Sequence, residues 1–172
     1  MLYLRLVSLV LLLCILGGCS QFYLMRTSGL SSSYTSPPIS SIVVSKEARR
    51  LYLFSGSEMI KAYRIRLGFN PLGDKKISGD GKTPEGKYYI DRKNPKSQFF
   101  LSLGISYPNK GDLAEAKSLG KPAGGDIFLH GEDKKFHFFN RDWTAGCIAL
   151  RNKDIREIYS VVDIGTPIFI RR

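Results

Sequence analysis

Side chains able to do acid–base or nucleophilic chemistry near neutral pH are scarce in this chain of 172 residues. It contains three cysteines and two histidines, and it has a single tryptophan. It also lacks an uninterrupted apolar run of the roughly 20 residues that a membrane-spanning helix needs. No internal repeat or heptad pattern is present, so a solenoid or a coiled coil is excluded.

The N-terminal residues have the organisation of an export signal. Arg5 is followed by an apolar stretch and then by small residues, an order typical of a secretory signal peptide over residues 1–18. The segment Leu16–Cys19 (LGGC) resembles the bacterial lipobox, which implies cleavage before Cys19 and lipid attachment to its sulfur. Ordinary cleavage without lipid is the alternative. We expect an exported, lipid-anchored protein, on the periplasmic face of the outer membrane if the cell is Gram-negative.

The rest of the chain divides into a tether and one domain. Residues 19–41 are rich in Ser, Thr, Pro and Gly and are too polar to build a core, so we interpret them as a flexible tether. Residues 42–172 are enough for one domain. They carry 24 basic and 15 acidic residues, which favours an anionic partner. For an exported protein this means the cell-wall polymer or lipid head groups before nucleic acid; a solvated basic surface is the alternative.

The domain is rich in short apolar segments bounded by Gly, Pro, Asn and Asp. They predict strands at Ile42–Ser45, Leu51–Phe54, Met59–Leu67, Lys87–Asp91, Phe99–Ile105, Asp126–His130, Lys135–Phe139, Cys147–Leu150 and Thr166–Ile170. A capping-box pattern at Asp112–Glu115 predicts one helix. Asn152 is expected to cap a second helix with an apolar face. The pattern therefore predicts a mainly β domain with two short helices.

The chemically active residue types are concentrated between positions 127 and 152. This stretch holds both histidines, the tryptophan and Cys147. Cys147 would be the only free thiol of the mature chain, because Cys14 lies in the removable signal and Cys19 would be acylated. An unpaired thiol in an exported protein is a liability unless it is buried or needed. A small buried apolar cysteine without chemistry is the alternative.

His130 and Cys147 each stand where an apolar run meets a glycine turn, so we expect them to meet at the rim of a sheet. A thiol with its usual pKa of about 8.5 is mostly protonated at neutral pH, but an adjacent imidazole can take the proton and leave a thiolate. The backbone N–H groups of Gly146 and Cys147 could stabilise the oxyanion formed when sulfur attacks a carbonyl. In an extended strand Arg151 would share a face with Cys147 and could reach a substrate carboxylate; a surface arginine is the alternative. These roles favour acyl transfer.

These motifs, in this order, resemble the L,D-transpeptidase catalytic-domain family, also called the YkuD fold. The family pattern of His-Gly, roughly fifteen residues and Ser/Thr-x-Gly-Cys stands here as His130-Gly131 and Thr144–Cys147. Residues 79–88 (GDGKTPEGKY) resemble the family's GD-x-x-TPEG-x-Y segment, and residues 101–109 and 124–127 resemble other stretches common in its members. The resemblance covers about residues 42–172.

The resemblance implies a β-sandwich-like fold and a cysteine enzyme that acts on peptidoglycan stem peptides without a cofactor. In such an enzyme the cysteine attacks the carbonyl of a diaminopimelate residue, expels D-alanine and passes the acyl group to an amine on another stem or on a protein. Cys147 takes the position of the nucleophile and His130 that of the base. The backbone carbonyl of Gly131 takes the position of the group that orients the imidazole.

Two positions depart from the family pattern. The family most often has arginine two residues after the cysteine, where this chain has Ala149, and Thr144 replaces the commoner serine. We expect Thr144 and Arg151 to contact substrate, with Arg151 as the replacement for the missing arginine.

Other functions stay open on the sequence alone. The same cysteine and histidine could use water as the acceptor, which would make the protein an L,D-carboxypeptidase or an amidase. A metal site built from His130, His137, Cys147 and Asp133 would have spacings that match no common zinc site. A wall-binding lipoprotein without catalysis would also explain the basic domain and the tether. His137 is expected to be structural, and Trp143 to be a packing residue.

Overall fold

The fold is described from a computed structural model, over residues 37–132 and 142–172. These residues form eight strands and two helices. The strands are β1 (Ser41–Ser45), β2 (Arg50–Ser55), β3 (Glu58–Arg64), β4 (Gly86–Ser97), β5 (Phe100–Ile105), β6 (Phe128–His130), β7 (Ile148–Ala149) and β8 (Pro167–Arg171), and the helices are α2 (Lys110–Ser118) and α3 (Asn152–Val161).

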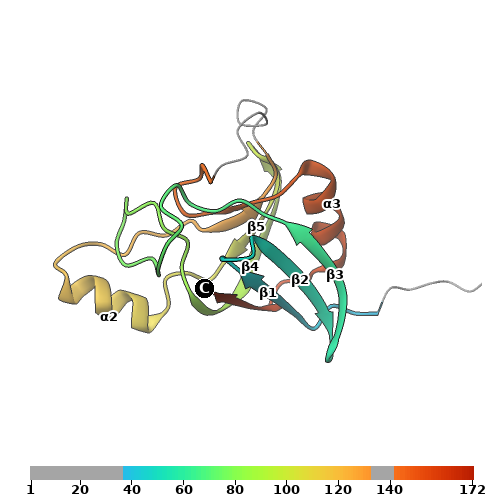
Figure 1. Cartoon of the computed structure of the whole chain (residues 1–172), viewed down its shortest axis with the longest axis horizontal. Coiled ribbons are helices and arrows are strands. Elements are labelled where there is room, and N and C mark those ends of the chain that lie inside the picture. The colour runs from blue at the N-terminus through green and yellow to red at the C-terminus, as the bar shows by residue number, and fades with distance from the viewer. Residues whose placement is uncertain (1–36, 133–141) are drawn as a thin grey trace, which may run out of the picture. The chain divides into compact units, whose positions relative to one another are not determined.

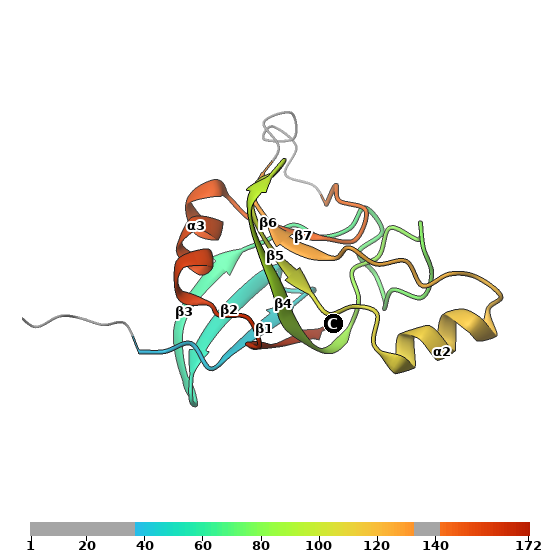
Figure 2. The same cartoon turned by 180° about the vertical axis from the view of Figure 1, so that it is seen from behind.

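All eight strands belong to one continuous sheet in the order β3-β2-β1-β8-β4-β5-β6-β7. The β1–β8 and β6–β7 pairs are parallel, and the other neighbours are antiparallel. The 12-residue strand β4 joins the two halves, because its first residues pair with β8 and its later residues pair with β5. Strands β1 to β3 lie towards the viewer in Figure 1 and β5 to β7 in Figure 2, so the sheet folds back on itself about β4.

The core lies between the two halves of this sheet, because alternate residues of each strand point inward. In the β1–β8 half, Ile42, Val44, Leu51, Leu53, Ile168 and Ile170 are buried, and in the β5–β7 half Leu103, Leu129 and Ile148 are buried. Helix α3 adds Ile155 and Ile158, both with no exposed surface, and contacts β5 and β6. The strand that carries the predicted base is therefore packed from behind by the core.

The two helices occupy different places. Helix α3 lies beside the sheet, whereas α2 projects away from it (Figures 1 and 2).

The N-cap of α2 is Asn109, which forms a capping box with Asp112, one turn earlier than the sequence pattern predicted. The expected cap of α3 is also corrected: the N-cap is Arg151, and the side chain of Asn152 instead accepts a hydrogen bond from the Glu132 backbone N–H at 3.0 Å. Within the described ranges no helix has the length and hydropathy needed to cross a membrane.

The predicted mainly β architecture with two short helices is confirmed. Boundaries differ where tertiary pairing decides them. Strand β4 continues to Ser97, six residues beyond its predicted end, because it pairs with β5 after it leaves β8. The strand predicted at Cys147–Leu150 is only Ile148–Ala149. The strand predicted at Lys135–Phe139 lies outside the described residues.

Leu129 provides a test of this core. Its side chain is fully buried on β6, so Leu129→Ala removes apolar contacts and leaves a cavity. We expect the free energy of unfolding, measured by urea denaturation, to fall by about 2–5 kcal/mol. Leu119→Ala is the matched control, because Leu119 is 53% exposed and its loss should change stability by about 0.5 kcal/mol or less. Equal effects of the two variants would contradict the placement of β6 in the core.

Candidate active site

Strand register brings His130 and Cys147 to one face of the sheet. His130 on β6 is the partner of Ala149 on β7 and of Ser102 on β5. Paired residues of neighbouring strands present their side chains to the same face, and residues two positions apart share that face. Cys147 stands two positions before Ala149, so it joins the face that carries His130. The opposite face carries the core residues Leu129 and Ile148.

This face is hollowed by a cavity of about 460 Å³. Its lining residues come from β4, β5, β6 and the turns around them: Asn94, Ser97, Gln98, Phe99, Ser102, Asp126, Phe128, His130 and Cys147. The predicted nucleophile and the predicted base therefore open into the same space. A cavity of this size with convergent polar groups is typical of a site that binds a small ligand or a peptide side chain.

The orientation of His130 is fixed by one hydrogen bond and two rings. Its Nδ1 lies 2.6 Å from the backbone oxygen of Gly131. A carbonyl can only accept, so Nδ1 carries the proton and Nε2 keeps a free lone pair. The ring stacks on Phe99 at 4.6 Å between centroids and meets Trp143 edge-on at 5.7 Å. The sequence-based orienting role of the Gly131 carbonyl thus has the geometry it requires.

The surroundings of His130 favour its neutral form. The residue is 3% exposed, and burial lowers the pKa of its imidazole below the usual 6.5, while the Gly131 carbonyl acts in the opposite direction. Desolvation disfavours the charged form of a buried base. At neutral pH the ring is therefore an unprotonated acceptor, as a general base must be.

Cys147 follows a tight turn that is held by two hydrogen bonds of the Thr144 hydroxyl and by the conformation of Gly146. The Thr144 hydroxyl donates to the carbonyl of Cys147 at 2.7 Å and accepts from the N–H of Gly146 at 3.2 Å. Gly146 has a φ of 139°, and a Cβ added there would lie 2.7 Å from the Lys82 carbonyl oxygen. Only glycine fits this position without strain. The turn thereby fixes the start of β7 and the direction in which the sulfur leaves the backbone.

The Cys147 thiol is held as a neutral group in this structure. Its sulfur donates to the backbone carbonyl of Asp126 at 3.4 Å. Burial raises the pKa of the Cys147 thiol, the backbone N–H of Phe128 opposes this shift, and the charge of Asp126 adds to it. Desolvation disfavours the anion, so the surroundings of Cys147 favour the neutral thiol, and the thiolate expected beside His130 stays a prediction. The pair is a neutral thiol and a neutral imidazole.

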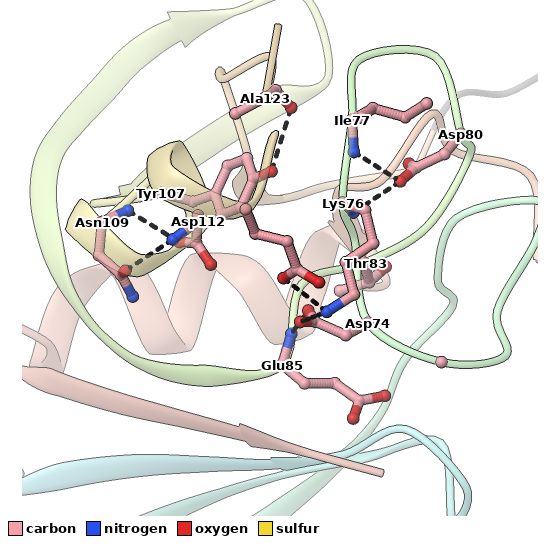
Figure 3. Close-up of polar contacts among 12 residues, drawn as sticks. Asp74, Lys76, Ile77, Asp80, Thr83, Glu85, Tyr107, Asn109, Asp112 and Ala123 are labelled. Atoms are coloured by element: carbon pink, nitrogen blue, oxygen red, sulfur yellow. Dashed lines mark hydrogen bonds and ion pairs between the residues drawn. The ribbon is translucent and has the colours of Figure 1, made fainter. Parts of the chain in front are cut away.

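The loop of residues 68–86 supports the cysteine turn from the other side. Figure 3 shows how carboxylates fold this loop: Asp80 accepts from the backbone N–H groups of Lys76 and Ile77 at 2.8 and 3.1 Å, and Asp74 accepts from that of Glu85 at 2.7 Å. The Thr83 hydroxyl accepts from the N–H of Gly68 at 3.1 Å.

Two buried lysines complete this support. The ammonium group of Lys46 donates to the Thr83 carbonyl at 2.8 Å and pairs with Glu85 at 2.9 Å. Lys75 pairs with Asp80 at 2.9 Å, and its positive charge acts to lower the pKa of Cys147. The segment that resembles the family's GD-x-x-TPEG-x-Y motif therefore lies against the turn before Cys147, where the Lys82 carbonyl approaches Gly146.

Thr144 has a structural position instead of the predicted substrate contact, and the predicted oxyanion donor Gly146 already has a hydrogen-bond partner. Thr144 is 4% exposed, and its hydroxyl both donates and accepts within the turn, so its predicted substrate contact is not supported. Gly146 lies beside the sulfur as predicted, but its N–H donates to Thr144. A substrate oxyanion would have to compete for that N–H, so its oxyanion role stays a prediction, shared with the N–H of Cys147.

Arg151 does not join Cys147. The strand ends at Ala149, and the guanidinium of Arg151 forms an ion pair with Asp154 at 2.7 Å and lines a different cavity. The arginine next to Ala149 is Arg66, whose backbone pairs with it through two hydrogen bonds of 2.9 Å. The proposed replacement of the missing family arginine by Arg151 is thus corrected.

Other predicted groups lie partly outside the described residues. Cys14, Cys19, Asp133 and His137 are among these, so neither lipidation nor the alternative metal site is tested. Within residues 37–132 and 142–172 no cluster of three or more His, Cys, Asp or Glu side chains could hold a metal ion. Trp143 packs against His130 and Phe99, as its predicted packing role requires.

Sequence patterns missed several residues of the site. The carbonyl of Asp126 receives the thiol, and Asp126 has a φ of 55°, a left-handed conformation that aspartate tolerates better than most residues. Phe99 stacks on His130, yet it lies 31 positions before it at the β4–β5 turn. Sequence offers no signal for a backbone carbonyl or for a stacking partner so distant, because both depend on strand register.

Comparison with known proteins identifies the family. The sequence profile of the L,D-transpeptidase catalytic domain (YkuD) matches residues 40–170, so the chain belongs to the L,D-transpeptidase catalytic-domain family. It is 30% identical over 128 residues to YafK of Escherichia coli K12, an alignment that covers 70% of this chain and 46% of YafK. It is 30% identical over 149 residues to YkuD of Bacillus subtilis 168, covering 84% and 72%. Both relatives are named provisionally as L,D-transpeptidases.

Solved structures agree with this assignment. The helical cell shape determining protein Pgp2 of Campylobacter jejuni superposes with a TM-score of 0.62 at 29% identity, over 80% of this chain and 49% of Pgp2. An L,D-transpeptidase of Mycobacterium smegmatis superposes with a TM-score of 0.51 at 14% identity, over 76% of this chain and 58% of that one, and this likeness supports the fold alone. The chain spans about half the length of YafK and of Pgp2.

The neutral state of Cys147 predicts a pH profile of alkylation. In a form that starts at Ser20, Cys147 is the only thiol, so the iodoacetamide alkylation rate reports its ionisation. Because burial raises the thiol pKa, we expect the midpoint of the rate profile to lie above that of free cysteine measured with the same reagent. A midpoint below that of free cysteine would show a resting thiolate and contradict the neutral pair.

Proposed function

We propose that the protein is a cysteine-dependent peptidoglycan L,D-transpeptidase. The observation that carries this proposal is the shared cavity of Cys147 and His130, in which His130 has its proton on Nδ1 and its Nε2 free. Membership of the L,D-transpeptidase family supports the reaction class. The substrate is a tetrapeptide stem, with attack on the carbonyl of diaminopimelate.

The first half-reaction uses both residues. As the Cys147 sulfur forms a bond to the diaminopimelate carbonyl carbon, its proton passes to Nε2 of His130, and the carbonyl oxygen becomes an oxyanion. The backbone N–H groups of Cys147 and Gly146 are the proposed donors to this oxygen. When the tetrahedral intermediate collapses, the carbon–nitrogen bond to D-alanine breaks and His130 returns the proton to the leaving amine. A thioester on Cys147 remains.

The second half-reaction passes the acyl group to an amine of another stem or of a protein. His130 takes a proton from the attacking nitrogen, and collapse of the second intermediate breaks the carbon–sulfur bond and returns the proton to Cys147. Water in place of the amine would give L,D-carboxypeptidase activity. The carbonyl of Gly131 keeps the imidazole oriented throughout without adding charge.

The neutral pair agrees with this sequence of steps. A neutral imidazole can accept a proton. If the thiol loses its proton only during attack, the negative charge develops on the substrate carbonyl oxygen, where the oxyanion donors act. The cavity is lined by polar side chains from β4 and β5 as well as by Phe99 and Phe128, which suits a peptide with both amide groups and an aliphatic side chain.

Loss of either reacting side chain should stop the reaction. We expect Cys147→Ala to form no transfer product from purified tetrapeptide muropeptides, and His130→Gln to lower kcat/KM by about 10²–10⁴-fold. Mass spectrometry of the reaction mixture measures cross-linked and tripeptide products, and mass spectrometry of the intact protein detects the thioester on Cys147.

Lys61→Gln is the control for these variants. Lys61 forms an exposed ion pair with Glu157 on another part of the surface, so its loss should leave activity unchanged. Tripeptide alone, without cross-linked product at high amine concentration, would show that water is the acceptor. Unchanged transfer products from Cys147→Ala would refute the proposed mechanism.

We further propose that the chain is exported and anchored by lipid on Cys19. The support is the apolar N-terminal segment followed by LGGC, which has the order of a lipoprotein signal. In cells fed a radioactive or alkyne-labelled fatty acid, the wild-type protein should incorporate label, and Cys19→Ser should not. Equal labelling of Cys19→Ser would refute the anchor at this residue, and Cys147→Ser serves as the matched control.

A further inference from the structure

A second cavity, of about 380 Å³, lies apart from the one that holds Cys147 and His130. Its lining includes five arginines but only two acidic residues. The arginines are Arg49, Arg50, Arg64, Arg66 and Arg151. The proposed transpeptidase reaction does not use this cavity. We propose that it binds a doubly charged phosphate group, with Arg50 and Arg64 as the principal contacts.

Three of the five guanidinium groups already have carboxylate partners. Arg49 pairs with Asp142 at 2.7 Å, and Arg66 pairs with Glu132 at 2.7 Å. Arg151 pairs with Asp154, also at 2.7 Å. Each acidic partner is at most 9% exposed. These pairs hold three arginine planes in fixed positions around the cavity, but they do not neutralise the other two arginines.

Arg50 and Arg64 are directly opposite each other on β2 and β3. Directly opposed residues of an antiparallel pair have Cβ atoms about 4.5–5.5 Å apart, and like charges there destabilise the sheet. Among the described residues neither side chain forms an ion pair with a carboxylate; the guanidinium of Arg50 donates only to the Arg49 carbonyl, at 3.4 Å. An anion placed between the two guanidinium groups would remove this repulsion.

The charge and geometry favour a phosphate group over a carboxylate. Two unpaired guanidinium groups match the two negative charges of a phosphate monoester or of inorganic phosphate, whereas a carboxylate carries one charge. Guanidinium groups form paired hydrogen bonds to the oxygens of a phosphate. The N-terminus of the ten-residue helix α3 adjoins the cavity through its N-cap Arg151, and the positive end of the helix dipole adds to the attraction.

Binding is tested on the full-length protein in micelles of an uncharged detergent. Thermal unfolding is followed with sodium phosphate, with sodium acetate and with sodium chloride at one ionic strength. Phosphate should raise the Tm above its value in chloride, and acetate should raise it less. Equal Tm values in the three salts, or equal effects of acetate and phosphate, would overturn the proposal.

Arg64→Gln gives the sharper result. In chloride this variant should have a Tm equal to or above that of the wild type, because a like-charge pair is removed. Its affinity for phosphate should fall at least tenfold. Lys61→Gln is the control, because it lies on the same strand and removes one charge outside the cavity; it should bind phosphate as the wild type does. Wild-type affinity in Arg64→Gln would refute the site.

A second variant covers the case in which Arg64→Gln does not fold. Arg50→Lys keeps the charge but loses the planar fork, so phosphate affinity should fall while the Tm in chloride stays near that of the wild type.

Micelles that contain phosphatidic acid identify the source of the phosphate group. Tighter binding than that of inorganic phosphate assigns a lipid headgroup, and equal binding assigns a soluble phosphate. Either result upholds the site. All measurements can be repeated in Cys147→Ala, so they do not depend on the proposed reaction.

Discussion

The short parallel pairing of β6 with β7 is the constraint on which the candidate active site depends. Strand β7 has only two residues, too few to hold its place by its own hydrogen bonds. It is fixed because β6 pairs with it on one side and the backbone of Arg66 pairs with it on the other. This double pairing places Ala149 beside His130, and the turn before it then sets Cys147 on the same face.

The surroundings of the candidate site favour the neutral forms of both Cys147 and His130. Among residues 37–132 and 142–172, a backbone carbonyl rather than a carboxylate orients His130, and aromatic rings cover the imidazole. The same burial that lowers the pKa of His130 raises that of Cys147. Both shifts oppose a resting ion pair, so in the proposed reaction the thiol would lose its proton only as it attacks. A protonated thiol is also less reactive towards oxidants than a thiolate.

The sequence could predict features that depend on local pattern. Alternating apolar residues such as Ile42 and Val44 identify strands, and the glycine turn before Cys147 identifies a rigid bend. It could not predict features that depend on register. Arg151 fails as a substrate residue because β7 ends at Ala149, and the residue that takes up the place next to Ala149 is Arg66, more than eighty positions earlier. The role of the Asp126 carbonyl has no side-chain signature at all.

Two ion pairs lie between the arginine-lined cavity and the candidate active site. Glu132 directly follows Gly131, whose carbonyl holds His130, and Asp142 directly precedes Trp143, whose ring packs against His130. The pairs Arg66–Glu132 and Arg49–Asp142 therefore stabilise residues next to the groups that orient the base. A ligand that displaced these carboxylates would disturb the imidazole. Arg50 and Arg64 can donate hydrogen bonds to an anion without breaking either pair. For this reason these two arginines, rather than the arginines paired with buried carboxylates, are the physically consistent contacts.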